Sequence, residues 1–214
     1  LGAASIGQVH KAVIKATGEE ICLKIQYPGV AEAVDSDLGA VESLLRMLKI
    51  VPITEEFRSW FQEIREMMYR EVDYAHEREK TKLFRQRLED DPRFIVPRVY
   101  DEFCSKRVIA TSYEPGADID APATKALSQA RRNTICRSAL DLCWKEVFLW
   151  GEMQTDPNFG NYFVRLGDGA NEPDRIVLLD FGAVREFSDK TLEPGRKIVK
   201  AAFLHDETLL LEGL

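Results

Sequence analysis

Five short elements stand in a fixed order along this chain of 214 residues, and their order constrains the fold more than any one of them does. They are a small-residue loop at 2–9, a lysine in an apolar run (Lys24), an acidic helical stretch at 54–90, Asp156 with an Asn five positions later, and an Asp-Phe-Gly triplet at 180–182. An Asp-Phe-Gly triplet alone occurs by chance in many proteins. All five together, at this spacing, predict a sheet-rich N-terminal lobe followed by a mainly helical C-terminal lobe.

The first element is the octamer at 2–9, which reads Gly-Ala-Ala-Ser-Ile-Gly-Gln-Val. It matches the protein-kinase phosphate loop G-x-G-x-x-G-x-V with one change, because Ala4 stands where the second glycine is expected. Glycine is used there because backbone N–H groups must approach phosphate closely, and because glycine tolerates positive φ. A small-residue turn that leads into a strand explains the octamer equally well, so both interpretations stay open for this segment alone.

The second element is Lys24, which lies between Leu23 and Ile25. Residues 16–20 read as a turn between two strands, so Lys24 is expected on the second strand of a hairpin. Protein kinases place such a lysine on a strand, where it pairs with nucleotide phosphates. A lysine in a buried strand is costly unless it is paired, so a carboxylate partner is expected. The alternative is an edge-strand lysine that points to water.

The third element is the charged helical stretch at 54–90, where Thr54 is placed to cap the helix. It contains Glu71, Asp73 and Glu77. Asp73 and Glu77 are four apart and share a helix face, whereas Glu71 and Asp73 would not share one on a regular helix. If all three carboxylates face one site, the helix must start, bend or pack unusually here. A solvated acidic face is the alternative.

The last two elements carry the metal and catalytic positions of a kinase. In protein kinases an Asp lies near the attacking hydroxyl, an Asn five positions later binds one metal, and the Asp of Asp-Phe-Gly binds the metals that bridge the phosphates. Two departures stand out: 153–155 read Met-Gln-Thr instead of carrying His-Arg before Asp156, and no Ala-Pro-Glu follows 180–182. A protein substrate is therefore less expected than a small molecule, or no phosphoacceptor at all.

As a set these elements resemble the UbiB family of atypical kinase-like proteins, the group linked to coenzyme Q biosynthesis. The residues that carry the resemblance are 3–10, 23–29, 71–74, 154–161 and 180–185. They span almost the whole chain and are highly specific together. The form Met-Gln-Thr-Asp-Pro-Asn is more similar to the coenzyme Q branch than to the plainer His-x-Asp-Pro versions.

The resemblance implies ATP and Mg²⁺ as cofactors and gives each matched residue a role. Lys24 would contact the nucleotide phosphates, with Glu77 as its ion-pair partner. Asp156 would occupy the catalytic-loop position, and Asn161 and Asp180 would hold magnesium.

Two further motifs take their meaning from the resemblance. Ala3, Ala4 and Ser5, with Gly7, would replace the glycine-rich loop at the nucleotide, and would favour ATPase activity or ligand-linked switching over routine protein phosphorylation. Residues 71–73 would supply the family's E-x-D element through Glu71 and Asp73. In relatives this element meets an N-terminal extension with a K-x-G-Q motif. The chain begins inside the phosphate loop without that extension, so it is expected to be a fragment.

The expected fold class is α+β, a two-lobed protein-kinase-like fold. One domain would span 1–214, with an approximate N-lobe at 1–113 and C-lobe at 114–214. Residues 111–116 would form the hinge, which places Glu114 where the adenine edge finds backbone partners; a plain turn is the alternative, since Pro-Gly marks turns generally. Strands are predicted near 8–14, 20–26, 96–103, 106–113, 161–166 and 175–180, and helices at 31–50, 54–90, 125–150 and 194–212. Trp60, Trp144 and Trp150 are predicted core residues.

Composition limits the classes of partner that are expected for this chain. With 45% hydrophobic and 30% charged residues the chain can bury a sizeable core. A net charge of −7 argues against a nucleic-acid partner held by counterion release. The four cysteines form no C-x-x-C pair, and reduced thiols fit a bacterial cytoplasm or a mitochondrial matrix. The resemblance implies quinone precursors, a membrane surface or quinone-biosynthesis proteins as partners, beside the nucleotide.

Two functions from different classes remain at this stage. The first is an ATP- and Mg²⁺-dependent atypical kinase or ATPase that supports isoprenoid-quinone biosynthesis. The second is a catalytically weak nucleotide-binding module that acts through lipid or protein partners. The joint presence of Lys24, Asp156, Asn161 and Asp180 favours retained chemistry.

Overall fold

The computed structural model describes residues 2–4, 6–48, 54–156, 158–169 and 172–213. The chain forms two compact units. The first unit comprises Leu1–Asp90, Val96–Pro115 and Asp180–Ala183, and the second comprises Asp91–Ile95, Gly116–Leu179 and Val184–Leu214. The mixed α/β content, with antiparallel strands in the N-terminal part, agrees with the predicted α+β class.

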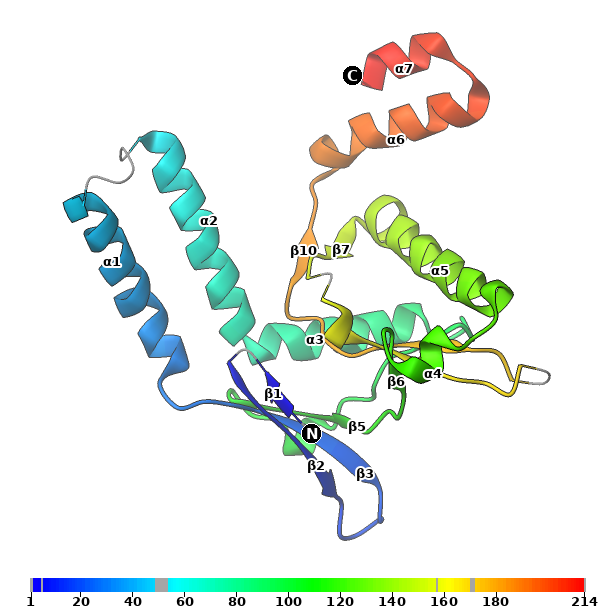
Figure 1. Cartoon of the computed structure of the whole chain (residues 1–214). Coiled ribbons are helices and arrows are strands. Elements are labelled where there is room, and N and C mark those ends of the chain that lie inside the picture. The colour runs from blue at the N-terminus through cyan, green and yellow to red at the C-terminus, as the bar shows by residue number, and fades with distance from the viewer. Residues whose placement is uncertain (1, 5, 49–53, 157, 170–171, 214) are drawn as a thin grey trace. The chain divides into compact units, whose positions relative to one another are not determined.

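The first unit is built on an antiparallel sheet with the strand order β1-β2-β3-β5 (Figure 1). Its strands are β1 (Gly2–Ala4), β2 (Gly7–Val13), β3 (Glu20–Gln26) and β5 (Val108–Ser112). Lys24 occupies the middle of the sheet, since it pairs with Val9 on one side and with Ile109 on the other. Ile21 and Ala110 are buried with Tyr100 in the sheet's own core. The predicted strand at 20–26 is confirmed, and those near 8–14 and 106–113 are confirmed within one or two residues.

Two long helices of the first unit, α1 (Val30–Leu48) and α2 (Glu55–Val72), lie side by side (Figure 1). The apolar residues Val34 and Leu38 of α1 pack against Phe57 and Phe61 of α2, because each helix carries its apolar residues on one face. Thr54 caps α2 as predicted: its hydroxyl oxygen accepts a hydrogen bond from the Phe57 N–H at 3.2 Å.

The acidic stretch predicted as one helix over 54–90 is broken at Asp73, so that prediction is wrong. α2 ends at Val72, and α3 (Tyr74–Arg87) leaves it at a sharp bend (Figure 1). Asp73 lies outside helical geometry, with φ −87 and ψ 79. Its side chain accepts hydrogen bonds from the N–H groups of Ala75 and His76, which starts a new helix. A bend at this position was expected only if Glu71, Asp73 and Glu77 all faced one site; the bend is present, but Glu71 and Asp73 are exposed.

The predicted strand at 96–103 is also wrong. Only Val99 forms an isolated bridge, with Thr111, and Asp101–Phe103 form a 3-10 turn. Val96 and Tyr100 of this segment are buried although they belong to no strand, and buried apolar residues give the same sequence pattern as a strand.

The second unit contains a four-stranded sheet with the order β4-β9-β8-β6 and a separate pair, β10-β7. The strands are β4 (Phe94–Ile95), β6 (Ala117–Asp118), β7 (Glu152–Gln154), β8 (Tyr162–Arg165), β9 (Arg175–Leu178) and β10 (Val184–Glu186). Most of β9 is buried: Ile176, Val177 and Leu178 are at most 5% exposed. The strands predicted at 161–166 and 175–180 correspond to β8 and β9. β1, β6, β7 and β10 have two or three residues each and were not predicted.

The helices of the second unit are shorter than predicted. They are α4 (Pro122–Lys125), α5 (Gln129–Trp144), the π-helix η2 (Lys145–Trp150), α6 (Asp189–Leu204) and α7 (Glu207–Gly213). The helix predicted at 125–150 thus changes to π geometry after Trp144. The helix predicted at 194–212 is interrupted at His205, whose φ of 53° is left-handed. Among the helices of the described ranges, none combines the length and apolar character that crossing a bilayer requires.

Two of the three tryptophans predicted as core are at the surface. Trp60 is 55% exposed and Trp144 is 51% exposed. Each keeps an aromatic neighbour on its own helix, Phe57 for Trp60 and Phe148 for Trp144, so ring contact replaces full burial. Trp150 is half-buried.

Candidate functional site

The first unit brings together three of the predicted site residues around the ammonium of Lys24. Lys24 Nζ donates to both carboxylate oxygens of Glu77, at 2.9 and 2.8 Å, and to Oδ2 of Asp180 at 2.9 Å. The three side chains come from β3, from the first turn of α3 and from the Asp-Phe-Gly triplet. The ion pair expected between Lys24 and Glu77 is therefore present, and Asp180 joins it.

The charges of this cluster do not balance. Burial works to lower the pKa of Lys24, but the carboxylates of Glu77 and Asp180 outweigh it and raise that pKa. Burial raises the pKa of the Glu77 carboxyl, although the Lys24 ammonium opposes this. With all three groups ionised the cluster carries one positive and two negative charges. A divalent cation at the Asp180 carboxylate would relieve that excess.

The Asp-Phe-Gly triplet is held in place by its own residues and by α3. Oδ1 of Asp180 accepts the Gly182 N–H at 2.8 Å, which closes a local turn. The Phe181 ring packs against Phe84 of α3, with ring centroids 4.8 Å apart, and both residues are fully buried. An added Cβ at Gly182 would lie 3.3 Å from Oδ1 of Asp180, a tight contact that this carboxylate could relieve only by a small shift.

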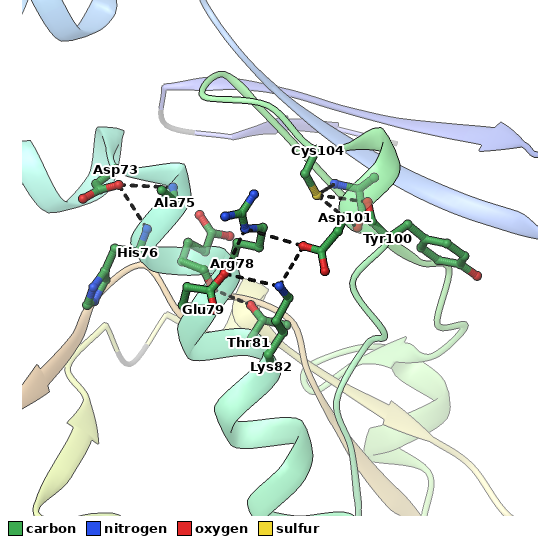
Figure 2. Close-up of polar contacts among 12 residues, drawn as sticks. Asp73, Ala75, His76, Arg78, Glu79, Thr81, Lys82, Tyr100, Asp101 and Cys104 are labelled. Carbon is green, nitrogen blue, oxygen red and sulfur yellow. Dashed lines mark hydrogen bonds and ion pairs between the residues drawn. The ribbon is translucent and has the colours of Figure 1, made fainter.

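The α3 helix that carries Glu77 is anchored at its start and along its outer face (Figure 2). Asp73 caps the first turn, four residues before Glu77. On the outer face, Lys82 pairs with Asp101 at 2.7 Å and Arg78 approaches the same carboxylate at 3.7 Å. These ion pairs tie α3 to the 3-10 turn at Asp101–Phe103, and so fix the helix that presents Glu77 to Lys24.

The predicted E-x-D residues do not join the Lys24 cluster. Glu71 is exposed in the last turn of α2, and Asp73 is exposed at the junction with α3. One carboxylate oxygen of Asp73 is used for the helix cap. Glu77 alone of the three acidic residues turns inward, because the break at Asp73 starts a new helix with its own set of faces.

The predicted phosphate loop forms a narrow hairpin. Ala3 pairs with Gln8, and Ala4 pairs with Gly7. Ser5 lies outside the described residues. A side chain at Gly7 is excluded by packing, since a Cβ there would lie 2.4 Å from the Ile25 carbonyl oxygen of β3. Gly7 therefore lets the hairpin lie directly on β3, a requirement that the phosphate-loop pattern did not reveal.

Glu114 follows β5 in the segment predicted as the hinge. Its Oε1 accepts a hydrogen bond from the Ser112 hydroxyl at 2.7 Å, and the Tyr113 N–H donates to the Glu20 carbonyl at 3.1 Å. The chain passes from the first unit to the second immediately after Pro115. Glu114 thus lies two residues from that passage.

The second unit holds the other two predicted site residues, Asp156 and Asn161, close together. Asn161 donates its side-chain N–H to Oδ2 of Asp156 at 2.7 Å, and the Asn158 N–H donates to Oδ1 at 3.3 Å. A 3-10 turn, Phe159–Asn161, returns the chain toward Asp156. The Asn161 carbonyl accepts the Leu179 N–H at 3.0 Å, which ties this loop to the segment that enters the Asp-Phe-Gly triplet.

Two further residues near these sites, Tyr74 and Glu146, carry no role predicted from the sequence. Tyr74 is 1% exposed, and its ring centroid lies 5.3 Å from Lys24 Nζ. It was part of the quoted 71–74 motif, but its type alone does not distinguish a core aromatic from a site residue. Glu146 is a buried carboxylate near Gln154, and no periodic pattern reveals it because it lies in a π-helix.

Comparisons with known proteins identify the family of this chain. The family model for the ABC1 atypical kinase-like domain matches residues 1–214. The chain is 40% identical over 209 residues to the mitochondrial atypical kinase coq-8 of Caenorhabditis elegans, covering 98% of this chain and 27% of that protein. It is 36% identical over 206 residues to the mitochondrial atypical kinase COQ8 of Saccharomyces cerevisiae, covering 96% of this chain and 40% of that protein.

A solved structure gives the same fold. The Mycobacterium tuberculosis protein Rv3197, in complex with erythromycin, matches 100% of this chain and 52% of that chain, with a TM-score of 0.75 and 28% identity. The chain thus spans about half or less of the length of these relatives. Its fold is kinase-like, with antiparallel strands in the N-terminal part. The chain belongs to the UbiB family, through its ABC1 atypical kinase-like domain.

Proposed function

We propose that this chain binds ATP with Mg²⁺ and transfers or hydrolyses the terminal phosphate, as an atypical kinase or ATPase that supports isoprenoid-quinone biosynthesis. The observation that carries the proposal is the Lys24–Glu77–Asp180 cluster. A buried lysine held by a bidentate carboxylate is the arrangement with which kinases orient a lysine toward phosphates. Membership of an atypical kinase-like family supports the same activity.

Each site residue has a part in this proposal. Lys24 donates to the nucleotide phosphates, and Glu77 fixes the direction of its ammonium. Asp156 orients the attacking hydroxyl or water. The hairpin with Ala3, Ala4, Ser5 and Gly7 covers the nucleotide, and the backbone beside Glu114 meets the adenine edge.

Asn161 and Asp180 fit magnesium by their donor chemistry. Mg²⁺ prefers oxygen ligands, and commonly uses one or two carboxylates together with substrate phosphates. Asp180 offers a carboxylate, and Asn161 offers an amide oxygen, because its amide nitrogen is the atom that contacts Asp156. When bound, the ion would neutralise charge that develops on the transferring phosphate. The protein's own part is to hold the Asp180 carboxylate beside the Lys24 ammonium in one unit, and the Asn161 amide beside Asp156 in the other.

The phosphoacceptor is proposed from the departures in the sequence. The segment after Gly182 passes into β10 at Val184, and α6 starts at Asp189. A long activation segment, on which protein kinases bind peptide substrates, therefore has no room between these elements. A quinone precursor or water is the proposed acceptor, with a lipid surface and quinone-biosynthesis proteins as partners. The relatives named mitochondrial support a mitochondrial matrix location, and a membrane-associated bacterial location is the alternative.

A second candidate function is a catalytically weak nucleotide-binding module that acts through lipid or protein partners. The observation that favours it is the hold of Lys24 on Asp180, at 2.9 Å. Magnesium at Asp180 would compete with that contact, so nucleotide binding would rearrange the cluster. In this case the rearrangement, rather than turnover, is the useful output.

Phosphate release from MgATP tests the proposal, with and without a quinone-like lipid. Asp156→Asn keeps nucleotide affinity and loses turnover if Asp156 orients the nucleophile. Glu193→Gln removes one exposed carboxylate from α6 of the same unit, and serves as the charge-matched control that keeps turnover. Binding of MgATP without turnover in the unmodified protein favours the regulatory module. Full turnover in Asp156→Asn contradicts the proposed role of Asp156.

A further inference from the structure

The second unit buries a carboxylate to which the kinase motifs give no role. Glu146 is 6% exposed and lies in the π-helix η2, which continues α5. π-helical turns are rare, and they occur frequently at functional sites. The turn ends at Gly151, whose φ of 67° is left-handed, and the chain then enters β7. The π-helix η2 and Gly151 together bring Glu146 into contact with β7, the strand that leads to Asp156.

A chain of hydrogen bonds links Glu146 to Asp156. The Gln154 N–H donates to Oε2 of Glu146 at 3.3 Å. The side-chain carbonyl of Gln154 accepts the Asp156 N–H at 3.2 Å. Gln154 is itself 8% exposed, and its bond to Glu146 is buried, whereas its bond from the Asp156 N–H is partly buried. Asp156 in turn accepts from Asn161 at 2.7 Å, which places four residues in one continuous network.

The network holds Asp156 through its backbone N–H, whereas other residues contact its carboxylate. Asp156 uses its N–H toward Gln154, and its two carboxylate oxygens face Asn158 and Asn161. Gln154 pairs with Val184 of β10, so the strand that carries the network also lies beside the exit of the Asp-Phe-Gly segment. Movement of Gln154 would therefore shift Asp156 relative to Asn158 and Asn161, which contact its carboxylate.

Burial of this carboxylate has a cost, which an apolar side chain at the same position would avoid. Burial raises the pKa of Glu146 to about 7, whereas the hydrogen bond from Gln154 lowers it. The oxygen of Glu146 meets a buried backbone N–H that would otherwise lose this partner. The buried Glu146 carboxylate is thus matched to the N–H of Gln154 in β7.

We propose that Glu146 is a positioning residue for the catalytic loop: it holds Gln154, and Gln154 holds the Asp156 backbone in the orientation that turnover requires. This inference rests on the proposed function for its effect on catalysis. Its structural part, the coupling of Glu146 to the Asp156 amide, does not depend on that function.

Three variants separate positioning from general destabilisation. Glu146→Ala removes the acceptor, and Glu146→Gln keeps an oxygen of the same reach. Leu142→Ala, one helical turn earlier, removes a buried side chain of α5 without touching the network. The measurements are kcat, the KM for MgATP, and hydrogen exchange at the amides of Gln154 and Asp156.

Glu146→Ala is expected to lower kcat by about tenfold or more with KM within about threefold, because a misplaced catalytic group loses rate rather than affinity. Exchange at the two amides is expected to rise by about tenfold or more. Glu146→Gln is expected to restore both quantities to near the unmodified values. Leu142→Ala is expected to lower the melting temperature while kcat of the folded protein is kept.

Two results would overturn the inference. The first is unchanged exchange at Asp156 in Glu146→Ala, which would show that the network is not coupled. The second is a loss of kcat in Leu142→Ala equal to that in Glu146→Ala at matched folded fraction, which would show a merely structural role. An unmodified protein without turnover would instead contradict the proposed function, and the exchange measurement would still decide the coupling.

Discussion

Glu77 accepts two hydrogen bonds from the ammonium of Lys24, at 2.9 and 2.8 Å, although the two residues are 53 positions apart in the chain. Glu77 is 5% exposed, so the pair is largely shielded from water. Asp180 adds a second carboxylate to the same ammonium. A buried ion pair of this kind contributes little net stability, but breaking it leaves an uncompensated charge. The cluster is therefore better explained by its orientation of the Lys24 ammonium than by a contribution to stability.

Removal of the Lys24 ammonium is expected to destabilise the protein. Lys24→Met leaves Glu77 and Asp180 close together without a cation, which costs about 3–5 kcal/mol of unfolding free energy at pH 7. The deficit is expected to shrink at pH 5, because burial raises the pKa of the Glu77 carboxyl and, without the opposing ammonium, this carboxyl takes up a proton more readily. Urea denaturation at both pH values measures the effect. Lys15→Met, at an exposed position, is the control. Equal stability of the two variants would contradict the expectation.

The Tyr74 hydroxyl is buried and has no hydrogen-bond partner among the described residues, and burial raises its pKa to about 12. Tyr74→Phe removes a polar group that is unsatisfied in this part of the chain, so stability is expected to stay equal or to rise by about 1 kcal/mol. Tyr100→Phe is the matched comparison, because the Tyr100 hydroxyl accepts from Arg98 at 2.7 Å and is expected to lose stability. Chemical denaturation of both variants measures the difference. A marked loss in Tyr74→Phe would show that its hydroxyl has a partner.

Asp73 is expected to stabilise the start of α3. Its carboxylate caps the N–H groups of Ala75 and His76, at 3.1 and 3.0 Å. Asp73→Ala is therefore expected to cost about 1 kcal/mol, and Asp73→Asn, which keeps a capping oxygen, much less. Thermal unfolding followed by circular dichroism measures both. If Asn and Ala cost the same, the cap is not the source of the stability, and the charge of Asp73 is.

Glu146 is expected to make stability depend on pH near neutrality. Burial raises its folded pKa to about 7 from an ordinary value of 4.5, so the folded state keeps the proton to higher pH than the unfolded chain does. Its contribution to stability is fully present below about pH 4.5, and is lost as the pH rises through 7. The loss is on the order of 3 kcal/mol at most.

Glu146→Gln cannot titrate, and so tests this sign directly. Its urea midpoint is expected to fall less between pH 5 and pH 8 than that of the unmodified protein. The difference between the two curves isolates Glu146, because all other titrating groups are shared. Parallel curves would contradict the shifted pKa.

Local sequence rules predicted the elements whose pattern is complete within a few residues. The turn at 16–20 and the apolar run around Lys24 place β3 correctly, and the Thr54 cap marks the start of α2. The Lys24–Glu77 pair was expected from the kinase order of motifs rather than from any local rule. The order of motifs predicted this pair because it is typical of the kinase fold, in which the two residues meet.

The errors have physical causes that a single sequence conceals. Asp73 interrupts an apolar-periodic stretch without glycine or proline, because its side chain competes for backbone N–H groups. The π turn after Trp144 keeps helical composition while it changes the spacing, so Glu146 could not be placed on a face. Trp60 was assigned to the core by its helical spacing with other apolar residues, and the structure leaves it at the surface beside Phe57.

Thermal unfolding with and without MgATP measures most directly whether the Lys24–Glu77–Asp180 cluster is part of a nucleotide site. A ligand that binds only the folded state stabilises it by about 2.7 kcal/mol at a hundredfold excess over Kd. We predict a Mg²⁺-dependent rise in melting temperature that is lost in Asp180→Asn and kept in Asp37→Asn, an exposed carboxylate of α1. No rise in the folded, unmodified protein, or an equal rise in Asp180→Asn, would contradict the proposed site.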